Sequence, residues 1–228
     1  MEAIFEIRFV PRQPWENLPG LLHAQIKGHY PEQATLPLYQ IPEEFRRQQA
    51  DLKYQPLIRF FGNDFSIHLG PCMVALITKS HGYPGWNRIH EELRWLMDRL
   101  MAGDFIEETE RLGVRYVDFI EGNVFDKLKL ALQLAGEPVT DAHTEVTTIL
   151  KDGPLTIRLA ASNGAIVGVG ESAKSGSVLD LDAWYGALGV ELFDNGLNRF
   201  SEAHQAIKSL FFGLLKDDFL NSLNPLYE

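Results

Sequence analysis

Hydrophobic and polar residues alternate at the start of the chain. Phe5 and Ile7 fall on one face of an extended segment, whereas Glu6 and Arg8 fall on the other. Alternation of this kind is typical of a β-strand with one buried face. The pattern therefore predicts a strand over residues 3–10.

The rest of the chain shows a mixture of alternating and helical spacings. Prolines and glycines separate these stretches, and Asp152-Gly153 is a strong hairpin-turn signal. Helices are predicted over 15–27, 86–101, 124–135 and 197–215. Strands are predicted over 36–41, 57–61, 65–69, 73–78, 114–120, 145–150, 155–159, 165–169 and 178–181. We therefore expect an α+β protein.

The order of elements repeats in the two halves of the chain. Val114-Arg115-Tyr116-Val117 echoes Ile7-Arg8-Phe9-Val10, and the starts of the two long helices match as well. Matches in the same order indicate an internal duplication. The sequence predicts a first repeat at 1–106 and a second at 107–228, packed as one compact unit. Each repeat would read strand–helix–four strands–helix.

This element order resembles the TATA-binding-protein-like or helix-grip architecture. In that architecture a curved antiparallel sheet wraps around long helices. The resemblance lies in the order of elements along the whole chain. It implies that the apolar faces of the strands pack against the two long helices.

Composition restricts the class of protein. Hydrophobic residues make up 45% of the chain and charged residues 23%, as is usual for globular domains. A single cysteine, Cys72, cannot form an internal disulfide, which favours a reducing compartment. The N-terminus does not read as a signal peptide, and no apolar run approaches the roughly 20 residues of a membrane span. We expect a soluble cytoplasmic protein.

The net charge of −10 disfavours generic binding of nucleic acid, which depends on cations that contact phosphates. The charge is unevenly spread. Residues 1–106 hold 11 basic and 12 acidic residues, whereas residues 107–228 hold 10 and 19. A local basic groove remains compatible with this balance, because net charge averages over all faces.

Two stretches resemble the marker strands of a sporadically distributed prokaryotic family of uncharacterised proteins. They are Glu2-Ala3-Ile4-Phe5-Glu6-Ile7-Arg8-Phe9 and Leu112-Gly113-Val114-Arg115-Tyr116. The family carries Glu-Ala-x-x-Glu-Ile-Arg-Phe and Leu-Gly-x-Arg-Tyr at these places. It usually has Asn soon after the Arg-Tyr pair, where Asp118 stands in this chain. The resemblance implies a bacterial or archaeal protein with no assigned reaction.

Charged and polar residues on the non-core faces of the predicted strands are the candidate ligand-binding residues. They are Arg8, Arg115, His68, Arg158, Asp180 and Asp182. A planar guanidinium on a sheet could hold a carboxylate or a phosphate in a bidentate manner. The same charges could instead pair with one another across neighbouring strands. Both interpretations stay open at this point.

The sequence contains no recognisable catalytic or metal-binding motif. His90-Glu91 begins like the helical motif of zinc proteases, but Arg94 stands where the second histidine would be. One cysteine cannot make a thiolate zinc cage. We therefore expect no metal site and no cofactor.

These observations favour a binding or protein-interaction module that receives a protein partner or a small ligand. An enzyme that acts on a small acidic ligand through an Arg/Asp cluster is the alternative. Nucleic-acid binding by the sheet is a second alternative, which the charge disfavours.

Overall fold

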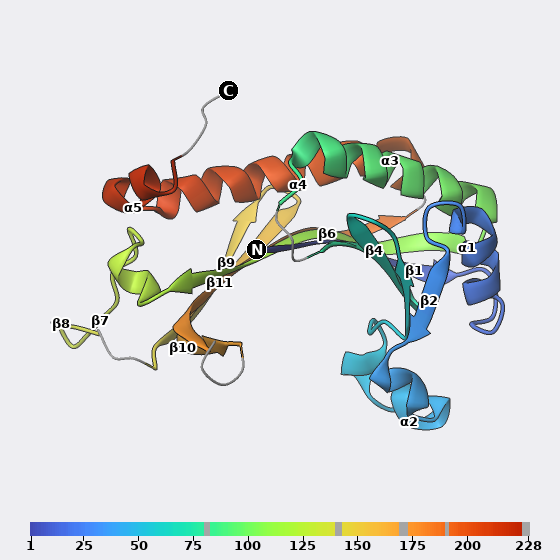
Figure 1. Ribbon diagram of the computed structural model, residues 1–228, viewed down its shortest axis with the longest axis horizontal. Helices are drawn as coiled ribbons and strands as arrows, with labels where there is room; N and C mark the ends of the chain where they lie inside the picture. The colour runs from blue at the N-terminus through green and yellow to red at the C-terminus, as the bar shows by residue number, and fades with distance from the viewer. Residues whose placement is uncertain (80–82, 140–142, 169–172, 190–191, 225–228) are drawn as a thin grey trace. The chain divides into compact units, whose positions relative to one another are not determined.

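The computed structural model describes residues 1–79, 83–139, 143–168, 173–189 and 192–224. Within these residues the protein is α+β, with a large antiparallel sheet and a few helices (Figure 1). The sheet has the strand order β2-β3-β4-β5-β1-β6-β11-β10-β9. No helix in this part of the chain is long and apolar enough to span a lipid bilayer.

The strands of the large sheet are β1 (Glu2–Pro11), β2 (Glu32–Thr35), β3 (Ile58–Phe61), β4 (Phe65–Gly70), β5 (Met73–Thr78), β6 (Ile106–Glu121), β9 (Glu145–Asp152), β10 (Leu155–Val167) and β11 (Lys174–Gly189). A separate pair consists of β7 (Gln133–Leu134) and β8 (Glu137–Pro138). The helices are α1 (Leu18–Ile26), α2 (Glu43–Arg47), α3 (Trp86–Gly103), α4 (Leu192–Leu214) and α5 (Asp217–Ser222). Short 3₁₀ turns are η1 (Pro37–Gln40), η2 (Ala50–Leu52) and η3 (Val124–Asp126).

The chain divides into two compact units. The N-terminal unit comprises Glu2–Val114 and Trp184–Glu202. The C-terminal unit comprises Met1, Arg115–Ala183 and Ala203–Glu228. Strands β6 and β11 and helix α4 therefore contribute residues to both units.

Alternation along the strands builds the core of the N-terminal unit. Phe5, Ile7 and Phe9 of β1 are buried, as their spacing predicts. Helices α1 and α3 lie on one side of these strands, and the segment with α2 lies on the other (Figure 1). Full burial of one such side chain stabilises the fold by roughly 1.5–3 kcal/mol.

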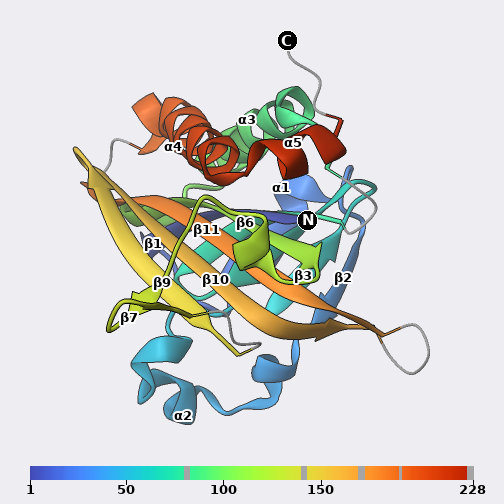
Figure 2. The ribbon, with the colours of Figure 1, turned by 90° about the vertical axis from the view of Figure 1, so that its left-hand side faces the viewer.

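The C-terminal unit uses the same principle. Figure 2 shows β9 and β10 side by side, and their antiparallel register places Leu155 opposite Asp152. Leu155 and Ile157 of β10 are buried, and so is Ile207 of α4. The apolar alternation of β10 thus faces the core, and its polar positions lie on the other side.

The predicted strand at 36–41 is wrong. Residues 37–40 form η1, and the strand of this region is β2, which pairs with β3. Pro37 fits the first turn of a 3₁₀ helix because its missing amide hydrogen is not needed there. All residues of β2 are exposed, so no alternation of polar and apolar residues marks it.

The predicted helix at 124–135 is also wrong. Only η3 forms, and the chain then runs extended into β7. Leu128 forms a β-bridge with Leu215, and Lys129 N donates to Leu214 O. The second half of the chain therefore lacks the early helix that the sequence predicts for it.

Several further boundaries differ from prediction. Strand β6 begins at Ile106, before its predicted start at residue 114, and β11 spans Lys174–Gly189, beyond the predicted 178–181. Residues 165–167 continue β10 and do not form a separate strand, whereas residue 169 lies outside the described residues. Helix α4 begins at Leu192, before its predicted start at Leu197.

Candidate anion-binding site

Arg115 and Asp180 lie on the polar sides of two long strands. Arg115 of β6 stands between Val114 and Tyr116, which are both buried. Asp180 of β11 likewise stands between two buried leucines. Successive side chains of a strand point to opposite faces, so the apolar neighbours fix the direction of the charged ones.

Two guanidinium groups converge on the Asp180 carboxylate. Arg115 donates from Nε to Oδ1 at 2.8 Å and from Nη2 to Oδ2 at 2.9 Å. Arg158 of β10 donates from Nη1 to Oδ2 at 2.9 Å. We call Arg115, Arg158 and Asp180 the Asp180 cluster. It joins three residues that the sequence singled out separately.

The carboxylate is the buried member of the cluster. The Asp180 side chain is 10% exposed, whereas those of Arg115 and Arg158 are 45% and 35% exposed. Burial by itself would raise the pKa of Asp180, but the hydrogen bonds and charges of the two arginines outweigh it and lower that pKa. Asp180 is therefore ionised at neutral pH. The cluster carries two positive charges and one negative charge.

Arg158 retains N–H donors that bond to no acceptor among the described residues. In the described part of the chain, Nη1 is the only Arg158 nitrogen with a hydrogen-bond partner. A guanidinium has five N–H donors in a fixed plane. The remaining edge of Arg158 can therefore bind an oxyanion without breaking the bond to Asp180.

Arg8 has a different set of partners. Its Nε donates to Glu6 Oε1 at 2.7 Å, and its guanidinium lies 4.5 Å from the centre of the Tyr54 ring. Arg111 also donates to Glu6. We call Glu6, Arg8 and Arg111 the Glu6 cluster. Its arginines are more enclosed than those of the Asp180 cluster, which makes it the less accessible of the two.

Arg111 was not predicted as a site residue from the sequence, although Gly113 provides a signal for it. A Cβ on Gly113 would lie only 2.6 Å from Arg111 Nη1, so the guanidinium lies directly across this glycine. The Arg111 guanidinium also stacks on Trp184, with Cζ at 5.0 Å from the ring centre. A glycine inside a strand indicates such a close approach.

His68 is buried, although the sequence places it on a non-core strand face. The residue is only 7% exposed, and the backbone of the segment before β3 lies against the same face of β4 at Gly70. A Cβ on Gly70 of the same strand would lie 2.4 Å from the backbone oxygen of Gln55. Ser66, which lies on the same face of β4, is buried as well.

The His68 ring is neutral and already engaged. Arg59 Nε donates to His68 Nε2 at 2.8 Å, so this nitrogen is the acceptor and the proton lies on Nδ1. Burial, followed by the charge of Arg59, lowers the pKa of His68 to about 4. His68 therefore supports the fold of the N-terminal unit and lacks a free lone pair at Nε2 for catalysis.

Asp182 lies two residues beyond Asp180 on the same side of β11 and is half-buried. Among the described residues, no group of three His, Cys, Asp or Glu side chains is placed to hold a metal ion.

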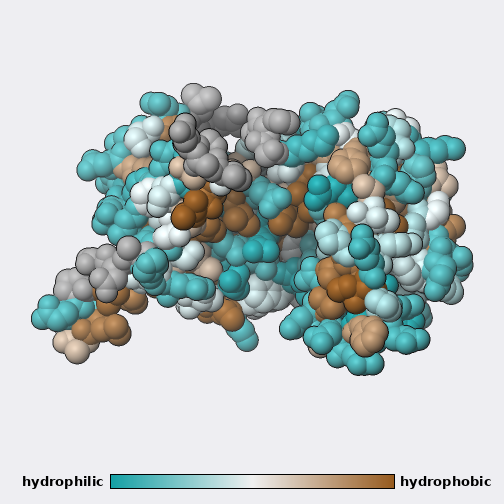
Figure 3. All heavy atoms as spheres, turned by 60° about the horizontal axis from the view of Figure 1, so that its bottom comes forward, coloured by the Kyte–Doolittle hydropathy of each residue, from teal (hydrophilic) through white to brown (hydrophobic). Residues whose placement is uncertain are grey.

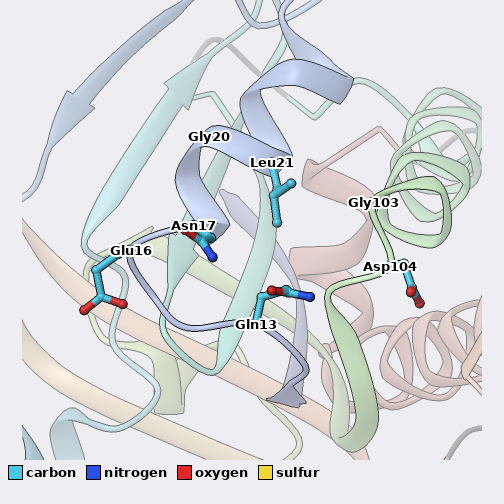
Figure 4. A pocket seen from close by; sticks show the side chains of 7 residues that line it. All are labelled: Gln13, Glu16, Asn17, Gly20, Leu21, Gly103 and Asp104. Atoms are coloured by element: carbon cyan, nitrogen blue, oxygen red, sulfur yellow. The ribbon is translucent and has the colours of Figure 1, made fainter.

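Two surface hollows occur in the N-terminal unit. The first, about 630 Å³ in volume, lies between α1 and the end of α3 and is lined mainly by polar side chains such as Gln13, Asn17 and Asp104 (Figure 4). The second, about 410 Å³, adjoins η1 and α2. Figure 3 shows a hydrophobic patch over the segment with α2, where Ile41 and Phe45 are exposed. Neither hollow contains a residue of the two arginine clusters.

No protein-family model and no curated protein matches the chain.

Proposed function

We propose that this protein is a binding module that receives an oxyanion, a carboxylate or phosphate group of its ligand or partner, at the Asp180 cluster. The observation that carries the proposal is the convergence of two half-exposed guanidiniums on one buried carboxylate. The carboxylate holds both arginines in place and neutralises only one of their charges. Such preorganisation lowers the entropic cost of binding an anion.

The enzyme alternative receives less support from the same cluster. A general acid or base needs a pKa near the working pH, and Arg115 and Arg158 hold the pKa of Asp180 low despite its burial. Both carboxylate oxygens accept hydrogen bonds from arginine. We therefore assign Asp180 a positioning role.

We further propose that the chain arose by duplication, with repeats at 1–106 and 107–228 in a helix-grip or TATA-binding-protein-like arrangement. The first half supports this proposal, because it reads strand, helix, four strands and helix, with the short helix α2 and two 3₁₀ turns inserted between β2 and β3. A carboxylate bridged by two arginines in each compact unit supports it too. The second half departs from the pattern where η3 replaces a helix.

Membership of the prokaryotic family with the Leu-Gly-x-Arg-Tyr strand is likewise a proposal. The close approach of the Arg111 guanidinium to Gly113 supports this proposal. It explains why a residue without a side chain stands at that position of the strand. A cytoplasmic location is proposed on the same footing, from the single cysteine.

Anion binding can be tested by thermal denaturation and calorimetry with inorganic phosphate and with succinate, at constant ionic strength. A ligand at free concentration L that binds only the folded state stabilises it by RT ln(1 + L/Kd), so the melting temperature keeps rising with ligand concentration. We expect both anions to raise it, and we expect Arg158→Gln to weaken binding about tenfold or more, because a charged hydrogen bond contributes roughly 1.5–3 kcal/mol.

Arg12→Gln is the matched control. Arg12 is also a half-exposed arginine in a single ion pair, with Asp104 at 2.9 Å. This variant should bind both anions like the unmodified protein. Equal binding by Arg158→Gln, or no effect of either anion on the unmodified protein, would contradict the proposal.

A further inference from the structure

Strand β9 is an open edge of the sheet. In the strand order it is the terminal strand, with β10 as its only neighbour among the described strands. Every residue of β9 is exposed except Val146, which is half-buried. An edge strand presents backbone N–H and C=O groups that another strand can pair with.

The centre of β9, residues 146–150, lacks the features that usually protect an edge, and the charged residues stand only at its ends. Natural edges are interrupted by proline, by bulges or by inward-pointing charges. Residues 145–152 contain no proline, and β9 pairs with β10 in an unbroken register. Its centre is apolar, and Ile149 and Leu150 are 59% and 41% exposed. The centre of this edge is therefore open to pairing with another strand.

The two faces of β9 continue the two faces of the C-terminal unit. Leu150 lies opposite Ile157, a buried residue on the core side of β10. Ile149 lies opposite Arg158, on the side of the Asp180 cluster. An added strand would therefore extend the core on one face and shield Ile149 on the other.

The sequence of β9 is complementary to itself in antiparallel orientation. When two copies are aligned about Thr148, Glu145 of each copy lies opposite Lys151 of the other, and Val146 lies opposite Leu150. Thr147 then lies opposite Ile149. Opposite charges and apolar pairs at directly facing positions each stabilise a sheet by roughly 0.2–1 kcal/mol.

We propose that β9 pairs with β9 of a second copy of this chain, in the register centred on Thr148. The contact is isologous, because a two-fold axis through the Thr148 pair relates the two strands. It joins two sheets edge to edge and buries both open edges at once. We choose a second copy as the partner because of the charges near the two ends of β9. When a second β9 runs antiparallel to the first, Glu145 of each copy faces Lys151 of the other.

A charge-exchange experiment tests both the partner and the register. We expect sedimentation equilibrium to show a monomer–dimer equilibrium. Lys151→Glu or Glu145→Lys alone should weaken dimerisation about tenfold, since each places like charges opposite each other at both ends of the strand pair. The double variant Glu145→Lys/Lys151→Glu should restore the affinity to within about threefold.

Rescue by the double variant is specific to pairing between copies. Within one chain, residues 145 and 151 are separated by about 20 Å of extended strand, so they cannot pair with each other. A monomer at all concentrations, or a double variant as weak as the single ones, would overturn the proposal.

Cysteine cross-linking gives an independent readout of the register. In a Cys72→Ser background, Thr148→Cys should form a disulfide between two copies on mild oxidation, because the two residues face each other. Lys151→Cys is the control, since its two copies would be about 20 Å apart. Cross-linking of the control, or none at position 148 in a dimer, would place the interface elsewhere.

Discussion

At the scale of single residues, Gly113 controls the position of the Arg111 guanidinium. The backbone of Gly113 does not have a positive φ, so alanine is compatible with it. Gly113→Ala should instead push Arg111 away from Glu6 and from the Trp184 ring. We expect a loss of about 1–2 kcal/mol in the free energy of unfolding, measured with urea.

A double-mutant cycle identifies the cause of that loss. Once Arg111→Ala has removed the guanidinium, the added Cβ at position 113 meets no clash. Gly113→Ala/Arg111→Ala should then be about as stable as Arg111→Ala alone. Simple addition of the two single effects would show that the clash with Arg111 does not explain the effect of Gly113→Ala.

The residues of the Asp180 cluster could be predicted from alternation alone. The polar positions in the alternation along the strands are occupied by Arg115, Arg158 and Asp180. Neighbouring strands bring residues at such positions together. His68 occupies the same kind of position, yet it is buried. The same face of β4 lies against the backbone of Gln55 at Gly70, in a segment without a periodic pattern, so alternation along β4 does not predict that this face is covered.

At the scale of elements, a buried hydroxyl fixes how η3 begins. Ser177 of β11 is fully buried, and its Oγ accepts from Val124 N at 3.0 Å. It also donates to Gly122 O at 2.6 Å. Ser177→Ala should cost about 1–3 kcal/mol, because the Gly122 carbonyl loses its donor and Val124 N keeps only its longer 3.3 Å bond to Asn163 Oδ1.

Ser175→Ala is the matched control on the same strand. Ser175 is exposed, so its replacement should change the free energy of unfolding by less than about 0.5 kcal/mol. Urea denaturation of both variants makes the comparison. A Ser177→Ala protein as stable as the control would contradict the role assigned to this hydroxyl.

The error at 124–135 has a physical cause in the same region. Residues at three- and four-residue spacing indicated a helix, but leucines also recur at every second position from Leu128 to Leu134. The second pattern is that of an extended chain. Bonds to the end of α4 and to β11 decide between the two, and such long-range partners are not visible in a local window.

At the scale of the whole molecule, two buried histidines should make the protein sensitive to acid. Burial is the main cause that lowers the pKa of both His68 and His204 to about 4. An unfolded chain has histidines with a pKa of about 6.5 and therefore binds more protons between these values. The contribution of the two neutral histidines to the free energy of unfolding should be fully present above about pH 6.5. It should be lost as the pH is lowered toward 4.

The expected change of the free energy of unfolding with pH is large enough to measure. Each histidine contributes at most about 1.4 kcal/mol per pH unit in this window, so the free energy of unfolding should fall by about 2 kcal/mol per unit. His68→Gln keeps an acceptor for Arg59 and does not titrate, and it should remove about half of the slope. Urea denaturation at several pH values measures this. A slope that the variant leaves unchanged would mean that His68 is not buried as a neutral ring.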